Sequence, residues 1–159
     1  MVEVSAQEYL CSRIRRAEQA LMAHHEAVLR AYGLAMTQYT VLLTLSREEG
    51  MSGAQLARAC GVTQQSMATV LTGMQAKGLI DRQPSPVHAK VMIATLTDVG
   101  QHLLDEAYQE VNVLEKAFVD TFTPAEHRQF CDLLDRATET LIEQTLRPTK
   151  SPSHRPPST

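Results

Sequence analysis

The sequence predicts a mainly α-helical fold that contains one small β-hairpin and has long amphipathic helices on either side of it. Three observations lead to this fold class. Apolar residues recur with helical spacing over most of the 159 residues. One pair of short runs with β-type composition lies near the middle of the chain, separated by prolines. Glycines and capping side chains stand where the helical segments should end and begin.

Composition bounds the class of protein. With 43% hydrophobic and 21% charged residues the chain is typical of a globular protein, which excludes a wholly disordered one. Its length suits one domain with extensions for dimerisation. No apolar run approaches the roughly 20 residues of a membrane span, and the N-terminus lacks a secretory signal pattern. We therefore expect a cytoplasmic protein with no membrane partner.

Residues 5–36 are predicted to form an N-terminal dimerisation helix. Apolar side chains recur at steps of three, four and seven between Ser5 and Tyr32, and Gly33 ends the helix. Thr37 is expected to cap the next helix. The leucines and valine of that next segment make it too apolar for a surface helix, so we expect it to be buried.

Residues 37–97 are predicted to form a compact domain of paired helices and a hairpin. The S-x-x-Q capping pattern at Ser52 opens a short helix, and Gly61 is the natural turn residue after it. Thr63 caps a second helix that extends to Lys77. Met67, Val70, Leu71 and Met74 recur at the spacing of a buried helix face. The residues on the other faces have small side chains or carboxamides.

The hairpin follows directly. Gly78 closes the second helix, and Leu79–Gln83 and Val91–Thr97 have the pattern of two short strands. Pro84 and Pro86 stand in the segment between them. The sequence therefore predicts a small β-wing with a stiff tip.

Residues 98–146 are predicted to form C-terminal dimerisation helices. The first begins at Thr97 and carries apolar residues at helical spacing. A capping box with proline at the first helical position begins at Thr123 and opens the second. Residues 147–159 contain four prolines and no apolar periodicity, so we expect a disordered tail.

The order of these elements is that of a winged helix-turn-helix between long terminal helices. The second paired helix carries Gln64, Gln65, Ser66 and Thr69 in its first two turns, the part of such a helix that usually enters the major groove. Glutamine can bond adenine through two hydrogen bonds, while serine and threonine donate, accept and touch the thymine methyl. The alternative is that these are ordinary solvated side chains.

Three stretches of the chain resemble the MarR family of transcriptional regulators: LARACGV, TQQSMATVLTGMQAKGLIDR and ATLTDVGQHLL. They are similar to that family's helix-turn-helix, its glycine-leucine entry into the wing and its L-T-x-x-G exit. The order and spacing of these pieces carry the resemblance, which extends over residues 5–146. It implies an obligate dimer built from the first and last two helices, a recognition helix at Thr63–Lys77 and a wing at Leu79–Leu96. The family often has a small-molecule pocket between these two regions.

The wing departs from the family's pattern near its tip. The family usually carries an Asp-x-Arg there, whose arginine is positioned for the minor groove, whereas this chain has His88, Ala89 and Lys90. Lys90 is expected to neutralise a phosphate, as is His88 when protonated, but neither has the planar fork of arginine. The alternative for His88 is an exposed turn residue without a role.

We therefore expect a homodimer that binds double-stranded DNA at a pseudo-palindromic operator, as a ligand-responsive repressor. Residues 37–97 carry five basic and three acidic residues, a net charge of +2, whereas residues 98–146 carry three basic and eleven acidic residues, a net charge of −8. The acidic segment is expected to face away from DNA. Phosphate contacts are expected from Arg58, Lys77, Arg82 and Lys90. The full expected set of DNA-contacting residues is Ser52, Arg58, Thr63, Gln64, Gln65, Ser66, Thr69, Lys77, Arg82, His88 and Lys90.

Two other functions remain open. The first is a winged helix without DNA affinity that binds proteins, either as an anti-repressor or as a scaffold. The net negative charge of the chain favours this function, and the amide-rich second helix argues against it. A thiol-based redox sensor is the other. In the peroxide-sensing branch of the family two tyrosines orient a cysteine on the first helix, and the matching positions here are Cys11, His25 and Met36. We expect Cys11, like Cys60 and Cys131, to be a small packed side chain.

The sequence contains no pattern typical of an enzyme. It lacks GxGxxG, GxxxxGK[ST], HExxH and GxSxG, so we expect neither catalysis nor a resident cofactor. A helix sends the adjacent His24 and His25 in different directions, and His102 with Glu106 lacks further metal ligands. The resemblance favours a small organic effector over a metal, because the family often binds planar anionic or phenolic compounds beside the winged domain. The seven methionines could line an adaptable apolar pocket, although methionines at helical spacing are more often part of the core.

Overall fold

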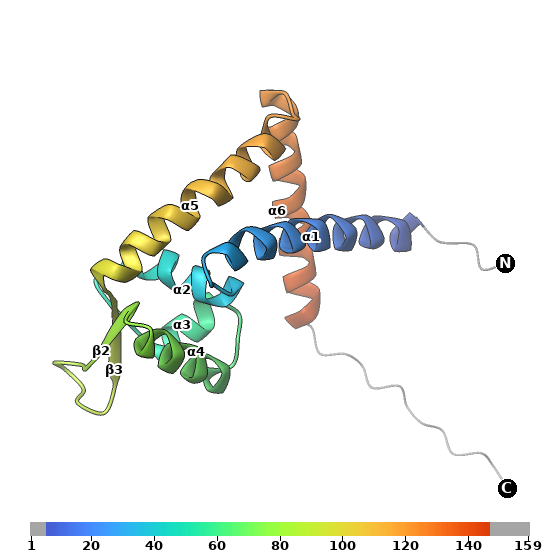
Figure 1. Ribbon diagram of the computed structural model, residues 1–159. Helices are drawn as coiled ribbons and strands as arrows, with labels where there is room; N and C mark the ends of the chain where they lie inside the picture. The colour runs from blue at the N-terminus through green and yellow to red at the C-terminus, as the bar shows by residue number, and fades with distance from the viewer. Residues whose placement is uncertain (1–5, 147–159) are drawn as a thin grey trace, which may run out of the picture. The chain divides into compact units, whose positions relative to one another are not determined.

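The computed structural model describes residues 6–146, and the tail predicted at 147–159 lies outside this part. The elements, shown in Figure 1, are α1 (Ala6–Ala31), α2 (Met36–Leu45), β1 (Met51–Ser52), α3 (Gly53–Ala59), α4 (Gln64–Ala76), β2 (Ile80–Pro84), β3 (Met92–Leu96), α5 (Asp98–Val119) and α6 (Pro124–Leu146). The chain divides into two compact units, of which the first ends at Leu114 and the second begins at Glu115.

The winged helix-turn-helix lies within the first unit. Helices α3 and α4 pack against each other, and β2 and β3 form a hairpin beside them (Figure 1). Strand β3 is the centre of a three-stranded antiparallel sheet in the order β1-β3-β2, where Ala94 pairs with Arg82 on one side and with Met51 on the other. The prediction of a two-stranded hairpin therefore missed β1. That strand has only two residues, and the second, Ser52, is also the cap of α3.

Buried apolar side chains fix which side of α4 faces outward. The prediction of a buried second helix is confirmed by α2, which also packs against α4. The buried residues of α2 and α4 are Tyr39, Val41, Leu42, Leu45, Met67, Leu71 and Met74. Each larger apolar side chain removed from water in this way contributes about 1.5–3 kcal/mol. This core holds the polar sides of α4 toward solvent.

Helix α2 begins before the predicted cap. Its N-cap residue is Ala35 and its first residue is Met36, so Thr37 lies inside the first turn. Alanine has no side chain that can accept a main-chain hydrogen bond. The Ala35 amide instead donates a hydrogen bond to Oε1 of Gln38 at 3.1 Å, which satisfies one of the free donors at this helix end.

The two ends of the wing meet where α4 stops and α5 begins. Gly78 ends α4 with a φ of 70°, a conformation that favours glycine. The hydroxyl of Thr97 donates a hydrogen bond to the carbonyl of Gly78 at 2.7 Å and accepts one from the Gly100 amide at 3.0 Å. A Cβ atom at Gly100 would lie 2.0 Å from the carbonyl oxygen of Leu79. The glycine-leucine entry into the wing (Gly78 and Leu79) and the L-T-x-x-G exit from it (Leu96 to Gly100) therefore contact each other in one junction.

The second unit contains the predicted capping box at the start of α6. The amide and hydroxyl of Thr123 donate to Oε2 of Glu126 at 2.9 and 2.8 Å, and the Thr123 hydroxyl accepts from the Glu126 amide at 3.3 Å. The hydrogen bonds from Thr123 hold the pKa of Glu126 below its ordinary value. The ring of Phe122 lies edge-on to Phe118, with centroids 5.4 Å apart, and is stacked on Phe130 at 5.5 Å. These rings connect the end of α5 to α6.

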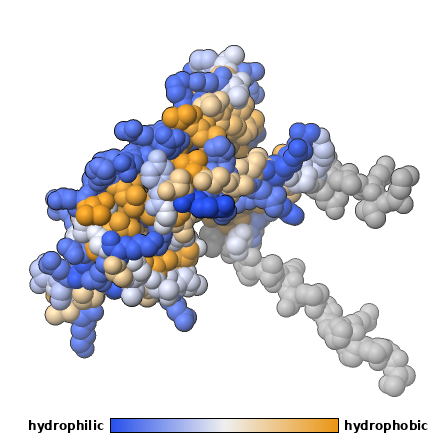
Figure 2. Space-filling model, in the orientation of Figure 1, coloured by the Kyte–Doolittle hydropathy of each residue, from blue (hydrophilic) through white to orange (hydrophobic). Residues whose placement is uncertain are grey.

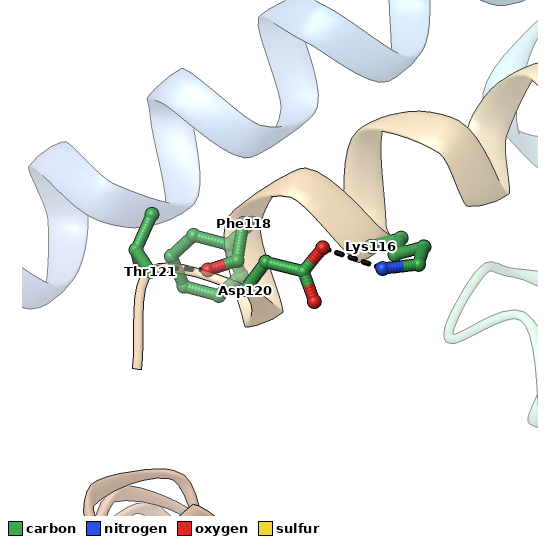
Figure 3. Close-up of polar contacts among 4 residues, drawn as sticks. All are labelled: Lys116, Phe118, Asp120 and Thr121. Carbon is green, nitrogen blue, oxygen red and sulfur yellow. Dashed lines mark hydrogen bonds and ion pairs between the residues drawn. The ribbon is translucent and has the colours of Figure 1, made fainter. Parts of the chain in front are cut away.

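Polar side chains also close the last turn of α5 (Figure 3). The ammonium of Lys116 donates to the carboxylate of Asp120, and the hydroxyl of Thr121 donates to the carbonyl of Phe118 at 2.7 Å. An exposed ion pair with this spacing contributes only about 0.3–0.5 kcal/mol. Aromatic packing is therefore expected to contribute more to this turn than the ion pair does.

Apolar side chains of α1 and α6 remain exposed in the single chain. Figure 2 shows apolar groups at the surface among hydrophilic ones. The exposed apolar residues of these two helices include Leu10, Ile14, Leu21, Phe130, Leu133, Leu134, Leu141 and Ile142. The single chain therefore leaves apolar surface on both of these helices open to solvent. Within residues 6–146 every helix falls short of the continuous apolar length that a transmembrane span requires.

Candidate nucleic-acid interface

Helix α4 begins with the predicted side-chain cap. Oγ1 of Thr63 accepts the Ser66 amide at 3.1 Å, and the two hydroxyl oxygens lie 2.9 Å apart and share a hydrogen bond. Thr63 is exposed, and its hydroxyl is engaged in these two contacts. Its main role in this structure is to orient the first turn of α4.

The side chains predicted to read bases are all exposed. Gln64, Gln65, Ser66 and Thr69 lie in the first two turns of α4, on the sides that the core leaves open. Within residues 6–146 neither carboxamide of the glutamines makes a hydrogen bond, so both retain their donors and acceptor for a ligand. The hydroxyl of Thr69 donates to the carbonyl of Gln65 at 3.3 Å. This arrangement can present amide, hydroxyl and methyl groups to the edges of base pairs.

Ser52 occupies a different environment from the other predicted contact residues. It is half-buried, its hydroxyl donates to Oε1 of Gln55 at 2.7 Å, and its amide donates to the same oxygen at 2.9 Å. The Ser52 hydroxyl also accepts the Gln55 amide at 3.4 Å. These bonds confirm the predicted capping pattern, and they engage the Ser52 side chain in positioning α3.

The four predicted phosphate contacts lie on α3, at the C-terminal cap of α4, on β2 and in the hairpin loop. Arg58, Lys77 and Lys90 are exposed, and Arg82 is half-buried on β2. In the part of the chain that the structure describes, none of these cations is paired with a carboxylate. The Nζ atom of Lys77 donates to the carbonyl of Gly33 at 3.2 Å, a contact between segments 44 residues apart that the sequence does not predict. This bond ties the end of α4 to the turn between α1 and α2.

The tip of the wing is a turn held by Ser85. Its hydroxyl accepts the amides of Val87 and His88 at 3.3 Å each. The Ser85 amide donates to the carbonyl of Val91 at 2.7 Å, and the Val91 amide donates to the carbonyl of His88 at 2.8 Å. These hydrogen bonds form the turn within the chain itself. His88 and Lys90 are both exposed, so the turn presents two basic side chains to solvent.

The environment of Cys11 differs from the prediction. Cys11 is exposed, not packed, because residues 9–20 of α1 are exposed throughout in the single chain. The other two cysteines are half-buried, and this burial raises the pKa of the Cys60 thiol. The guanidinium carbon of Arg13, a basic residue two positions after Cys11, lies 4.3 Å from the ring centroid of Tyr9, and Arg13 donates a hydrogen bond to the Tyr9 hydroxyl. Exposure alone does not make Cys11 a reactive thiol.

The histidines are scattered over separate environments. His25 is only 5% exposed, whereas the adjacent His24 is exposed. Nδ1 of His102 lies 3.8 Å from Oε2 of Glu106 on the exposed side of α5. No group of three or more potential metal ligands comes together among residues 6–146.

A shallow hollow lies at the turn between α1 and α2. It has a volume of about 430 Å³ and is lined by Glu26, Arg30, Gly33, Leu34, Ala35, Met36 and Gln38. Its lining combines apolar side chains with two oppositely charged residues, Glu26 and Arg30. The Gly33 carbonyl that accepts the Lys77 hydrogen bond belongs to the same turn. One hydrogen bond therefore links Gly33, which lines the hollow, to the end of α4.

Comparison with known proteins places this fold and sequence among winged-helix regulators. The MarR family model matches residues 32–90. An HTH-type transcriptional repressor of Mycobacterium tuberculosis is 32% identical over 110 residues, which cover 69% of this chain and 79% of the repressor. A MarR family protein of the same organism, solved in complex with p-aminosalicylic acid, has a TM-score of 0.64 and 29% identity over 81% of this chain and 98% of that one. AbsC, a MarR family transcriptional regulator from Streptomyces coelicolor, has a TM-score of 0.78 and 21% identity over 90% of this chain and 99% of its own.

Proposed function

The chain belongs to the MarR family, and from this membership we propose that it is a transcriptional repressor that binds a pseudo-palindromic operator in double-stranded DNA as a homodimer. The observation that carries the proposal is the exposed start of α4, where the carboxamides of Gln64 and Gln65 have no hydrogen-bond partner within residues 6–146. Family membership alone leaves open whether this chain binds DNA. The chemistry of α4 supports the binding of a duplex.

Major-groove recognition accounts for the residue types on α4. Gln64 and Gln65 each offer a donor and an acceptor in one plane, which matches the N6 and N7 positions of adenine. Ser66 and Thr69 add a hydroxyl and a methyl group, which suit the other base edges and the thymine methyl. A surface for binding another protein would more often carry aromatic residues, methionine and arginine.

A dimer supplies the second recognition helix. The apolar faces that α1 and α6 leave exposed are of the kind that a second copy covers. Two-fold symmetry then places the two copies of α4 about 34 Å apart, one turn of the double helix. Each α4 would read one half of a pseudo-palindromic operator.

An organic anion is the effector that we propose. A relative that is 29% identical was solved with p-aminosalicylic acid, a planar aromatic carboxylate. In this chain the hollow is lined by apolar side chains, by the carboxylate of Glu26 and by Arg30, whose guanidinium can pair with a ligand carboxylate. A ligand there would press on Gly33, whose carbonyl holds Lys77 at the end of α4. That connection offers a route by which ligand binding weakens DNA binding.

The test of the proposed function is selection of bound sequences from a random duplex pool by the full-length protein. Recovery of a two-fold symmetric sequence, with half-sites one helical turn apart, is the expected result. The Gln64→Ala, Gln65→Ala double variant is expected to recover no consensus while it retains weak binding to random DNA. Addition of p-aminosalicylate is expected to reduce binding by the wild type, and Arg30→Ala to remove that effect. A protein that enriches no sequence at low salt refutes the proposal.

A further inference from the structure

One face of α4 points directly away from the core, and Gln65 is the longest side chain on it. Gln65, Thr69, Thr72 and Ala76 recur at steps of four, three and four residues, and all four are exposed. This spacing places them on a single helix face, opposite the buried methionines and leucine of the same helix. We call these four residues the outward face of α4. The carboxamide of Gln65 extends further from the helix than the other three side chains.

The hydrogen-bonding groups of the outward face differ in what they can still offer. The hydroxyl of Thr69 donates to the carbonyl of Gln65 at 3.3 Å, and the hydroxyl of Thr72 donates to the carbonyl of Ala68 at 2.9 Å. Both hydroxyl donors are therefore engaged within the helix. The Gln65 carboxamide makes no hydrogen bond within residues 6–146. On the outward face it is the group that keeps a free donor beside an acceptor.

We infer that the Gln65 carboxamide reads one adenine in each half-site, and that methylation of this adenine at N6 releases the protein from its operator. The inference rests on the proposed DNA-binding function and adds a form of regulation to it. A glutamine fits adenine because its oxygen accepts from the N6 amino group while its amide donates to N7. In the major groove guanine presents two acceptors, cytosine a donor and thymine an acceptor. Adenine is therefore the base whose edge uses both groups of the carboxamide.

An N6-methyl group removes this contact because adenine is paired. One N6 hydrogen is bonded to thymine within the base pair, and the other points into the major groove, where the Gln65 oxygen accepts it. A methyl group that leaves the base pair intact replaces the second hydrogen. The donor is then lost, the methyl group occupies the place of the Gln65 oxygen, and that oxygen is left without a partner. N7 is unchanged, so only one of the two hydrogen bonds keeps its partner on the base.

The two half-sites are expected to respond separately, since each copy in the proposed dimer supplies one Gln65. Methylation of one half-site is expected to weaken binding about ten-fold, which lies within the discrimination that one glutamine–adenine contact provides. Free energies of distant contacts add, so methylation of both half-sites is expected to weaken binding about a hundred-fold. An operator with one methylated strand position would thus be bound with intermediate affinity.

The experiment uses the full-length protein and the operator recovered from the random pool. Each adenine of one half-site is replaced in turn by N6-methyladenine or by 7-deazaadenine, and affinities are measured by fluorescence anisotropy. The second analogue keeps the N6 donor and lacks the N7 acceptor, so it tests the other half of the same contact. Both replacements are expected to weaken binding of the wild type at the same adenine, N6-methyladenine by about ten-fold. Gln65→Ala is expected to bind all three duplexes alike.

Two other glutamines of α4 supply controls. Gln64→Ala is expected to weaken operator binding and to keep the methylation penalty at this adenine. Gln75→Ala shortens an exposed glutamine outside the expected contact set, so it is expected to keep both the affinity and the penalty. The inference is overturned by a penalty that persists in Gln65→Ala, by a wild type that tolerates N6-methyladenine at every position, or by half-sites that require no adenine. A wild type that prefers no sequence over random DNA refutes the proposed function instead.

Discussion

The hydroxyl of Thr97 donates a hydrogen bond to the carbonyl of Gly78 at 2.7 Å and so joins the exit of the wing to the end of α4. The same hydroxyl accepts the amide of Gly100, in the first turn of α5. One threonine thus links α4, the wing and α5. The placement of the wing relative to α4 depends on this junction.

Gly100→Ala is expected to lower the free energy of unfolding by about 3 kcal/mol, because the added Cβ would lie 2.0 Å from the Leu79 carbonyl oxygen. Gly73→Ala is the matched control in α4. Open space surrounds its Cβ position, and alanine favours the helix, so this change is expected to raise the free energy of unfolding by about 0.5–1 kcal/mol. Urea denaturation followed by circular dichroism checks both values. Equal stability of the two variants would show that the junction tolerates a side chain.

The capping box of α6 is expected to make stability depend on pH. Because the pKa of Glu126 is lowered in the folded chain, its contribution to stability is complete above the ordinary value of 4.5 and is lost as the pH falls through the lowered folded value. Glu126→Ala should therefore melt below the wild type at neutral pH and equally with it in strong acid. Glu139→Ala, another exposed carboxylate of α6, is the control. A difference for Glu126→Ala that stays constant across the pH range would rule out this assignment.

Leu141→Glu is expected to convert a dimer into a monomer, because it places a charge on an apolar face of α6 that we assign to the dimer interface. Gln129→Glu adds the same charge at an exposed polar position of α6 away from the Leu141 stripe and is expected to remain dimeric. Light scattering at micromolar concentration measures both masses. A monomeric wild type would overturn the proposed dimer.

Lys90→Ala is expected to weaken operator binding modestly and to reduce the slope of log K against log salt concentration by about one for each lost phosphate contact. The reason is that Lys90 is exposed beside the wing tip and is not paired with a carboxylate within residues 6–146. Titrations at several salt concentrations give the slope. An unchanged slope would mean that Lys90 does not reach the phosphate backbone.

Local signals in the sequence predicted much of the fold. The caps at Ser52, Thr63 and Thr123 act between residues only three apart, so the sequence alone specifies them. The exposed start of α4 followed from helical periodicity, because the core face is determined by the apolar spacing. The start of α2 was predicted two residues late, because Gln38 caps Ala35 from inside the helix and no cap residue marks the position.

Contacts between distant segments were not predictable in this way. The bond from Lys77 to Gly33, the pairing of β1 with β3 and the burial of His25 depend on the assembled fold and leave no periodic pattern. The apolar spacing around Cys11 predicted a packed side chain, but Cys11 is exposed. The reason is that residues 9–20 of α1 are exposed throughout in the single chain. The sequence predicted which residue types form the candidate site. It did not predict which of their side chains make hydrogen bonds within the chain, as Lys77 does to Gly33.

The central claim is that the start of α4 reads bases, and comparison of Gln65→Ala with Arg82→Ala on operator and random DNA tests it most directly. The account predicts that Gln65→Ala costs about 1–3 kcal/mol on the operator, relaxes the preference at one base position and leaves binding to random DNA nearly unchanged. Arg82→Ala is predicted to weaken binding to both kinds of DNA alike. Equal losses on operator and random DNA for Gln65→Ala would contradict the claim.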